Sequence, residues 1–274
     1  MAVIADTHLH SAFSGDSETP MKAMIEKALE LGLKEICFTE HMDFDFVYTE
    51  DEPGDMFEVN TDAYLYDLLR FRQEYEGRIK LLFGVELGMQ TGPTQRKNLM
   101  YCKEHEFDFV IASSHLCNGK DPYLKESFFG GRDEKEAYHE YFTYIWECIR
   151  GFQNFDVYGH LDYVLRYGPE TNKNFTMAEY GADIDKILKL LIENGKGIEA
   201  NTSGYAYGMG GPHPSFEILK RYKELGGEII TIGSDAHDCE HMAQHFDDTA
   251  ALLKEAGFEY YCVFENRYPE YHRL

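Results

Sequence analysis

The chain opens with Met1-Ala2-Val3-Ile4-Ala5-Asp6-Thr7-His8-Leu9-His10, where a short apolar run leads directly into a His-x-His pair. Alternate side chains of an extended chain point the same way, so His8 and His10 are expected to face one point. Further along the chain, other short apolar runs are again followed by a histidine or a carboxylate. These runs predict strands at residues 3–5, 36–39, 81–85, 107–111, 155–158, 197–200 and 229–232, and a last one at 260–264.

Apolar residues at helical spacing lie between the predicted strands, as at Ile184, Ile187, Leu188 and Leu191. Seven or eight buried strands, each followed by a helix, favour a (β/α) barrel for this α/β chain over an open doubly wound sheet. The open sheet stays an alternative, because the pattern does not encode strand order. No Pro/Ser-rich linker, repeat or low-complexity tract divides residues 1–274, so we predict a single domain.

The composition restricts the class of partner. The 274 residues carry 26 Lys and Arg against 49 Asp and Glu, a formal net charge of −23. Such a field repels phosphate backbones, so neither nucleic acid nor an anionic membrane surface is expected as a partner. We expect neither a signal peptide nor a membrane span, since the chain has no basic leader before an apolar stretch and no run of about 18 apolar residues. With six scattered cysteines and no C-x-x-C pair, a cytoplasmic protein with reduced thiols is predicted.

Polar motifs follow the predicted strands, and they carry the functional signal. They are Asp6-Thr7-His8-Leu9-His10, Thr39-Glu40-His41, Gly84-Val85-Glu86, Ser114-His115, Gly159-His160-Leu161-Asp162, Asn201-Thr202-Ser203 and Gly233-Ser234-Asp235-Ala236-His237. In a parallel barrel all these points converge on one rim, where barrel enzymes keep their active sites. A single histidine after a strand is usually an ordinary polar residue, so the inference depends on the recurrence. The remaining histidines in helical or terminal contexts are expected at the surface: His105, His139, His241, His245 and His272.

Histidine nitrogens and carboxylate oxygens without cysteine suit borderline divalent ions such as Zn, Mn or Fe. More than four such ligands at one rim require more than one ion. Paired metal sites promote hydrolysis, especially of phosphate esters, by supplying the nucleophile and neutralising charge on the phosphoryl oxygens.

Together with Ser14-Gly15-Asp16, the strand-end motifs resemble those of the PHP family, the polymerase and histidinol phosphatase superfamily, over almost the whole chain. Within that family, Glu199-Ala200-Asn201-Thr202-Ser203-Gly204 and His213-Pro214-Ser215 resemble the histidinol-phosphatase branch. The resemblance implies a distorted (β/α)7 TIM-like barrel that holds two or three divalent ions at the carboxyl-terminal rim of its strands.

The resemblance also implies a set of metal ligands. The first ion would be held by His8, His10, Glu86 and Asp235. Glu86 would bridge to a second ion, held also by His115 and His160. The third ion would be held by Asp16, His41 and His237. Asp16 stands where some relatives have histidine, and an oxygen ligand there favours a harder ion such as Mn or Fe.

The implied reaction is the hydrolysis of L-histidinol phosphate to L-histidinol and phosphate, a step of histidine biosynthesis, with this small phosphate monoester as the partner. A hydroxide bridging the first two ions would attack phosphorus in line, while the third ion would bind phosphoryl oxygens or the departing alkoxide. The candidate catalytic residues are Glu86, Asp235 and Arg166. Arg166 is also the candidate phosphate clamp, because guanidinium can hold phosphate in a bidentate manner; an ordinary exposed arginine is the alternative.

The substrate contacts are less specific predictions. Asn201 and Ser203 are expected to line the pocket. Asp43, with Asp45 and Asp51 in the same acidic stretch, is expected to receive the ammonium or imidazole of the substrate, with an ordinary solvated loop as the alternative.

Three other readings are kept open. One is a different PHP phosphoesterase, either a protein-tyrosine phosphatase or a nuclease-type domain, although the acidity counts against the nuclease. Another is a non-catalytic metal-binding scaffold, which would have a broken ligand set, whereas this set is complete. The last is a deamidating or decarboxylating barrel enzyme, which often has a carboxylated lysine after a middle strand, where this chain has none.

Overall fold

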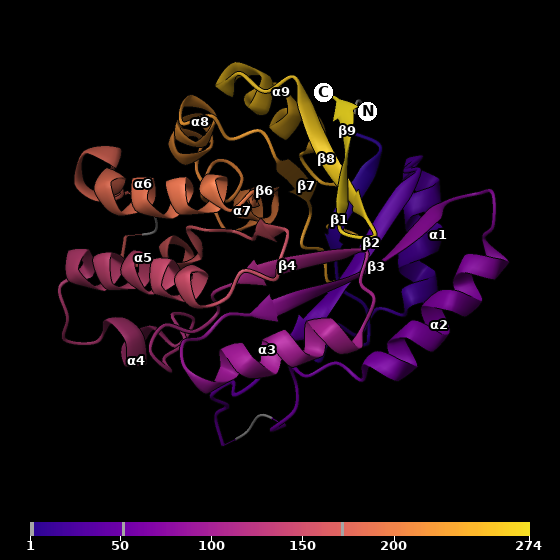
Figure 1. Ribbon diagram of the computed structural model, residues 1–274, viewed down its shortest axis with the longest axis horizontal. Helices are drawn as coiled ribbons and strands as arrows, with labels where there is room; N and C mark the ends of the chain where they lie inside the picture. Colours follow the sequence, from indigo (N-terminus) through magenta and orange to yellow (C-terminus); the bar gives the residue numbers. More distant parts are fainter. Residues whose placement is uncertain (1–2, 51–52, 171–172) are drawn as a thin grey trace.

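The computed structural model describes residues 3–50, 53–170 and 173–274. Its centre is a sheet of seven parallel strands in the order β1-β2-β3-β4-β5-β6-β7, and Figure 1 shows the helices arranged around the outside of these strands. The strands are β1 Ala5–Leu9, β2 Glu35–Met42, β3 Lys80–Gly88, β4 Phe109–Ser113, β5 Val157–Tyr158, β6 Gly197–Asn201, β7 Ile230–Gly233, β8 Tyr260–Glu265 and β9 Tyr268–Arg273. The helices are α1 Met21–Leu31, α2 Thr61–Glu74, α3 Pro93–Glu104, α4 Lys125–Phe129, α5 Glu134–Gly151, the 3-10 helix η1 Tyr163–Arg166, α6 Met177–Glu193, α7 Ser203–Ala206, α8 Phe216–Glu224 and α9 Phe246–Ala256.

The sheet closes on itself where the chain leaves β7 and passes beside β1. The backbone N–H of Asp235 donates to the carbonyl of His8 at 2.8 Å, and the N–H of His10 donates to the carbonyl of Ala236 at 3.0 Å. A doubly wound sheet reverses its strand order at a switch point, whereas these strands follow the sequence order throughout. The open-sheet alternative is therefore excluded, and the predicted distorted (β/α)7 barrel is confirmed.

Several strands extend further than the apolar runs predict. β1 spans Ala5–Leu9 rather than residues 3–5, so the side chains of Asp6 and His8 lie inside the strand, where both are fully buried. β2 and β3 also continue past their predicted runs, and their parallel register places His41 opposite Glu86. These polar residues belong to the strands themselves, so the pleat of the backbone fixes the direction of each side chain.

Helix α6 shows how the sequence determines where a helix of the outer layer begins and which face it buries. The Thr176 hydroxyl accepts a hydrogen bond from the Glu179 N–H at 3.3 Å and caps the first turn. Asp185 accepts two hydrogen bonds of 2.7 Å from Arg221 of α8 and ties the two helices together. The buried face of α6 consists of Tyr180, Ile184, Ile187, Leu188 and Leu191. Across the described ranges, no helix is long and apolar enough to cross a membrane.

The last predicted strand forms outside the barrel. β8 pairs with β9 in an antiparallel hairpin rather than joining the parallel sheet. The Tyr261 hydroxyl accepts a hydrogen bond from the Ile4 N–H at 3.1 Å, and the Phe264 ring stacks on Phe109 with centroids 5.1 Å apart. The hairpin therefore packs near the amino-terminal ends of β1 and β4, at the end of the barrel opposite the polar rim.

Candidate active site and metal centre

The histidines and carboxylates predicted to meet at one rim do lie together. They come from the carboxyl ends of six strands, which carry or shortly precede His8, His10, His41, Glu86, His115, His160, Asp235 and His237. Asp16 joins them from the loop between β1 and α1. Asp235 has a left-handed backbone with φ of 56°, which the hydrogen bond from its N–H to β1 helps to hold.

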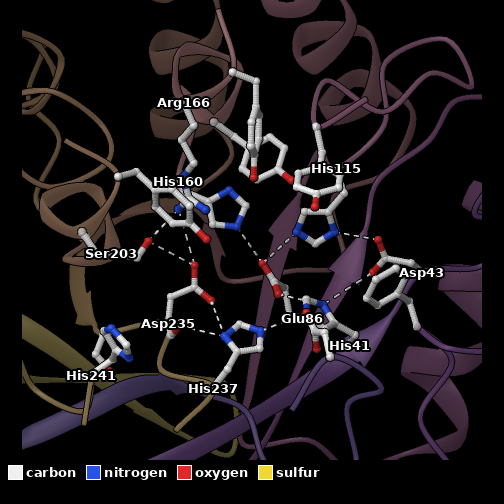
Figure 2. Close-up of a pocket in the computed structure, with 18 of the residues that line it drawn as sticks. His41, Asp43, Glu86, His115, His160, Arg166, Ser203, Asp235, His237 and His241 are labelled. Carbon is white, nitrogen blue, oxygen red and sulfur yellow. Dashed lines mark hydrogen bonds and ion pairs between the residues drawn. The ribbon is translucent and has the colours of Figure 1, made fainter. Parts of the chain in front are cut away.

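Glu86 is the centre of this cluster, and five imidazole nitrogens lie within 3.5 Å of its carboxylate. Figure 2 shows three of these rings, those of His41, His115 and His160. The distances from its Oε1 are 2.9 Å to His160 Nε2 and 3.3 Å to His115 Nε2. The distances from its Oε2 are 3.1 Å to His41 Nδ1, 3.4 Å to His8 Nε2 and 3.5 Å to His10 Nε2. Each carboxylate oxygen thus faces a different group of histidines, as a bridging ligand between two ions does.

Two further carboxylates extend the cluster on either side. Asp235 Oδ1 lies 3.5 Å from the Nε2 atoms of both His8 and His10. Asp16 Oδ2 lies 3.1 Å from His237 Nε2 and 3.4 Å from His41 Nε2. His41 therefore directs one ring nitrogen toward Glu86 and the other toward Asp16.

The donor set fits divalent metal ions. Several buried atoms of the cluster have no hydrogen-bond partner within the described part of the chain, among them His8 Nε2, His10 Nε2, His41 Nδ1 and Glu86 Oε2. Such atoms are costly to bury unless a further group binds them, and these converge on common points. Three sets of ligand atoms each lie within 4.8 Å of one another: His8, His10 and Asp235; His10, His41 and His237; and His41, Glu86 and His115. Nitrogen and oxygen donors without sulfur suit Zn, Mn or Fe.

The other ring nitrogen of His8, His115 and His10 is held by a residue behind the cluster. His8 Nδ1 lies 2.6 Å from Glu199 Oε1, and His115 Nδ1 lies 2.6 Å from Asp43 Oδ2. His10 Nδ1 lies 3.0 Å from the Ser14 hydroxyl. A proton on each of these nitrogens leaves the other nitrogen free to bind a metal ion, which is the usual arrangement behind metal-ligating histidines.

Electrostatics keep the ligand carboxylates ionised. Burial alone would raise the pKa of Glu86, but His8 and His115, which are protonated until a metal ion replaces the second ring proton, hold it well below its usual value. Burial alone would also raise the pKa of Asp235, but the charge of His8, the hydrogen bond of His10 and the charge of His237 together hold it well below its usual range. Burial, together with the charges of neighbouring histidines, lowers the pKa of His10 to about 3, so this ring is neutral and able to act as a ligand.

A cavity of about 630 Å³ opens above the cluster, a size that suits a small molecule. Arg166 lines it but is only 7% exposed, so the alternative of an ordinary surface arginine is excluded. Its Nη2 donates to the Ser203 hydroxyl at 2.6 Å and lies 3.5 Å from Asp235 Oδ2. Ser203 lines the cavity as predicted, whereas Asn201 is fully buried and donates to Asp235 and Glu199 from behind.

A family model described as the PHP domain matches residues 6–203. The chain belongs to the PHP domain family. Among its relatives, the histidinol-phosphatase of Lactococcus lactis subsp. lactis (strain IL1403) is 34% identical over 264 residues, which cover 94% of this PHP chain and 93% of that protein. A probable histidinol-phosphatase of Clostridium acetobutylicum is 31% identical over 272 residues, which cover 98% and 100% of the two chains.

The fold of this PHP domain also matches a solved structure. The crystal structure of histidinol phosphate phosphatase from Lactococcus lactis subsp. lactis Il1403, complexed with zinc, L-histidinol and phosphate, superposes with a TM-score of 0.87. The two sequences are 32% identical, and the match covers 97% of this chain and 98% of that one. The predicted resemblance to the histidinol-phosphatase branch is confirmed.

Some expectations for the PHP site need correction. Asp43 lines the cavity, but its Oδ2 is bound to His115 Nδ1 at 2.6 Å, which leaves only its buried Oδ1 without a hydrogen-bond partner among the described residues. Asp45 bonds instead to Thr94 and Lys97, and Asp51 lies outside the described residues. His241 is exposed, as expected, but it also lines the cavity and bonds to Asp238 at 2.8 Å. His105, His139, His245 and His272 are partly or fully exposed and do not line it.

Sequence reasoning did not identify Glu199 as the support of His8. Its place in Glu199-Ala200-Asn201, at the carboxyl end of a predicted strand, was the available signal. It also did not identify the aromatic side chains that form much of the cavity wall. These are Phe46, Phe57, Tyr123, Tyr163, Tyr167 and Tyr207.

Proposed function

We propose that this PHP chain, acting as a single unit over residues 1–274, is a metal-dependent phosphatase that hydrolyses L-histidinol phosphate to L-histidinol and phosphate. The observation that carries the proposal is the Glu86 carboxylate with five imidazole nitrogens within 3.5 Å, beside a buried arginine at the floor of a small-molecule cavity. The likeness to a histidinol-phosphatase over 94% of the chain supports the choice of substrate.

In this proposal the site holds two or three divalent ions of Zn, Mn or Fe. His8, His10, Glu86 and Asp235 hold the first; Glu86, His115 and His160 hold the second; and Asp16, His41 and His237 hold the third. Asp235 lies 3.5 Å from His8 and His10, Glu86 Oε1 lies within 3.3 Å of His115 and His160, and Asp16 lies within 3.4 Å of His41 and His237, which supports this division. His41 also directs its Nδ1 toward Glu86 at 3.1 Å, between the sets. Zinc accompanies the related Lactococcus structure.

When bound, the metal ions lower the pKa of a water to provide the nucleophile and neutralise charge on the phosphoryl oxygens. Arg166 supplies a guanidinium that binds phosphoryl oxygens, and the Ser203 hydroxyl beside it donates or accepts a further hydrogen bond. Glu199 and Asp43 keep His8 and His115 in the tautomer that ligation requires.

The charge of the site explains how an acidic protein binds a phosphate. Three divalent ions carry more positive charge than the carboxylates of Asp16, Glu86 and Asp235 carry negative charge, so the cavity floor is cationic once loaded. Asp121 and Asp238 line the same cavity, and their negative charge favours the cationic ammonium and imidazole end of the substrate. A small zwitterionic ester fits this arrangement, whereas a long polyanion is repelled by the net charge of −23.

The test is steady-state hydrolysis by metal-loaded protein of three substrates: L-histidinol phosphate, phosphotyrosine and a generic aryl phosphate. We expect kcat/KM to be highest for L-histidinol phosphate. A preference for phosphotyrosine or the aryl ester would overturn the substrate assignment. Inactivity of the fully loaded protein on all three esters would overturn the phosphatase assignment.

A further inference from the structure

Behind the cavity, three buried side chains form a hydrogen-bonded series that no metal ligand explains. Asp162 precedes η1, Arg166 ends it, and His213 lies beyond α7, 51 residues after Asp162. His213 Nδ1 lies 2.5 Å from Asp162 Oδ1, and the Nε–H of Arg166 donates to His213 Nε2 at 2.8 Å. Asp162 and His213 are fully buried, and His213 does not line the cavity.

The partners fix the proton on the His213 ring. Guanidinium nitrogens only donate, so His213 Nε2 must accept, and the ring proton must sit on Nδ1 and bond to Asp162. The second oxygen of Asp162 accepts from the Ser215 N–H at 2.8 Å. The backbone of His213 is joined to Asn201, at the end of β6, by two hydrogen bonds of 2.7 Å. The ring is thus held at both nitrogens and through its own backbone.

The neutral ring orients Arg166 without cancelling its charge. A carboxylate at the same place would form an ion pair and weaken the attraction of the guanidinium for an anion in the cavity. On the His213 side of Arg166, the nearest charge is the carboxylate of Asp162, and the imidazole ring of His213 lies between the two. Tyr163 and Tyr207 contact the guanidinium through their rings, with the central carbon 5.0 and 4.3 Å from the ring centroids. These contacts leave the terminal nitrogens on the cavity side, near Ser203.

We propose that His213 is a positioning residue for Arg166, which sets the direction of the guanidinium toward the phosphoryl group, and that Asp162 fixes the tautomer of His213. The inference rests on the proposed function, because it takes Arg166 as the phosphate ligand. It predicts that changes at His213 act on catalysis only through Arg166.

The test compares two amide variants of His213 in two backgrounds. The side chain of His213→Asn reaches the place of Nδ1 and keeps the contact with Asp162, whereas His213→Gln reaches the place of Nε2 and keeps an acceptor for Arg166. We expect His213→Asn to lower kcat/KM for L-histidinol phosphate by about 10- to 100-fold and to weaken inhibition by inorganic phosphate. His213→Gln should retain more activity, and in an Arg166→Ala background His213→Asn should cause little further loss.

His139→Asn is the matched control, because His139 also bonds to a carboxylate, that of Asp183, but lies outside the cavity. It should match the wild type, and all variants should hold the same amount of metal. The inference is overturned by an equal loss from His213→Asn in both backgrounds, by unchanged kcat/KM, or by loss of metal. If His213→Asn does not fold, His213→Gln serves instead: because it keeps an acceptor for Arg166, kcat/KM close to that of the wild type supports the positioning role, and a loss that is equally large in the Arg166→Ala background overturns it.

A second readout separates this inference from the proposed function. If the wild type does not hydrolyse L-histidinol phosphate, the proposed function fails. Calorimetric titration of the metal-loaded protein with inorganic phosphate then tests His213 directly. Weaker binding by His213→Asn, with no difference between Arg166→Ala and the double variant, supports the positioning role, and equal binding by His213→Asn and the wild type overturns it.

Discussion

Replacing Glu199 with glutamine tests whether residues behind the ligands set the metal affinity of the site. Glu199 is fully buried, and its Oε1 lies 2.6 Å from His8 Nδ1. Its Oε2 accepts from Asn201 Nδ2 at 3.1 Å and from the His160 N–H at 3.2 Å. A glutamine amide has one oxygen, so its NH2 group must face either His8 or the other two donors. If the NH2 group faces His8, the ring proton of His8 must move to Nε2, where it blocks metal binding. If the NH2 group faces the other way, the Asn201 amide and the His160 N–H lose their acceptor.

Loss of such a supporting carboxylate weakens metal affinity by about 10- to 100-fold, or about 1.4–2.8 kcal/mol. Competition with a fluorescent zinc chelator measures the affinity, and circular dichroism checks the fold. The matched control is Glu179→Gln, because Glu179 also pairs with a histidine, His139 at 3.2 Å, but on the surface of α6. The control should bind zinc like the wild type. A folded Glu199→Gln protein that also binds zinc as tightly as the wild type would refute this account of His8.

Three further changes test other parts of the account. Arg166→Ala should lower kcat/KM for L-histidinol phosphate by about 100-fold at unchanged metal content, and an unchanged kcat/KM would remove Arg166 from the mechanism. Gly233→Ala would place a methyl 2.3 Å from the His8 Cβ, so elemental analysis should find less metal in a folded protein; wild-type content would contradict this. Asp185→Asn should lower Tm at pH 7 by roughly 1–2 °C. Hydrogen bonds from Arg221 lower the pKa of Asp185 below 3.8, so the ion pair stabilises the fold above pH 3.8 and its contribution is lost as the pH falls below that value. A difference in Tm between the variant and the wild type that does not change with pH would contradict this.

The rim of the barrel could be predicted because parallel strands bring their carboxyl ends to one edge whatever the strand lengths. Strand ends were less predictable. An apolar run ends at Ala5, yet β1 continues through Asp6 and His8, because Asp6 is satisfied by the N–H and hydroxyl of Ser234. A polar residue inside a strand is recognisable only once its distant partner is known.

The supporting contacts could not be predicted, because they join residues far apart in the sequence. Glu199 meets His8 across 191 positions, and nothing in either local sequence specifies that contact. Asp43 illustrates the same difficulty: its acidic loop predicts a contact with substrate, whereas the 2.6 Å contact of its Oδ2 with His115 Nδ1 joins residues 72 positions apart and has no local signal. The β9 strand was also missed, since Tyr268–Arg273 alternates without a buried face.

The central claim is that divalent ions bound around Glu86 are required for phosphate ester hydrolysis. The most direct measurement is elemental analysis of the purified protein alongside its rate on L-histidinol phosphate, before chelation, after chelation and after reloading with Zn, Mn or Fe. The account predicts two or three ions per active chain, loss of hydrolysis on chelation and recovery on reloading. A metal-free sample that hydrolyses L-histidinol phosphate at the full rate would contradict it.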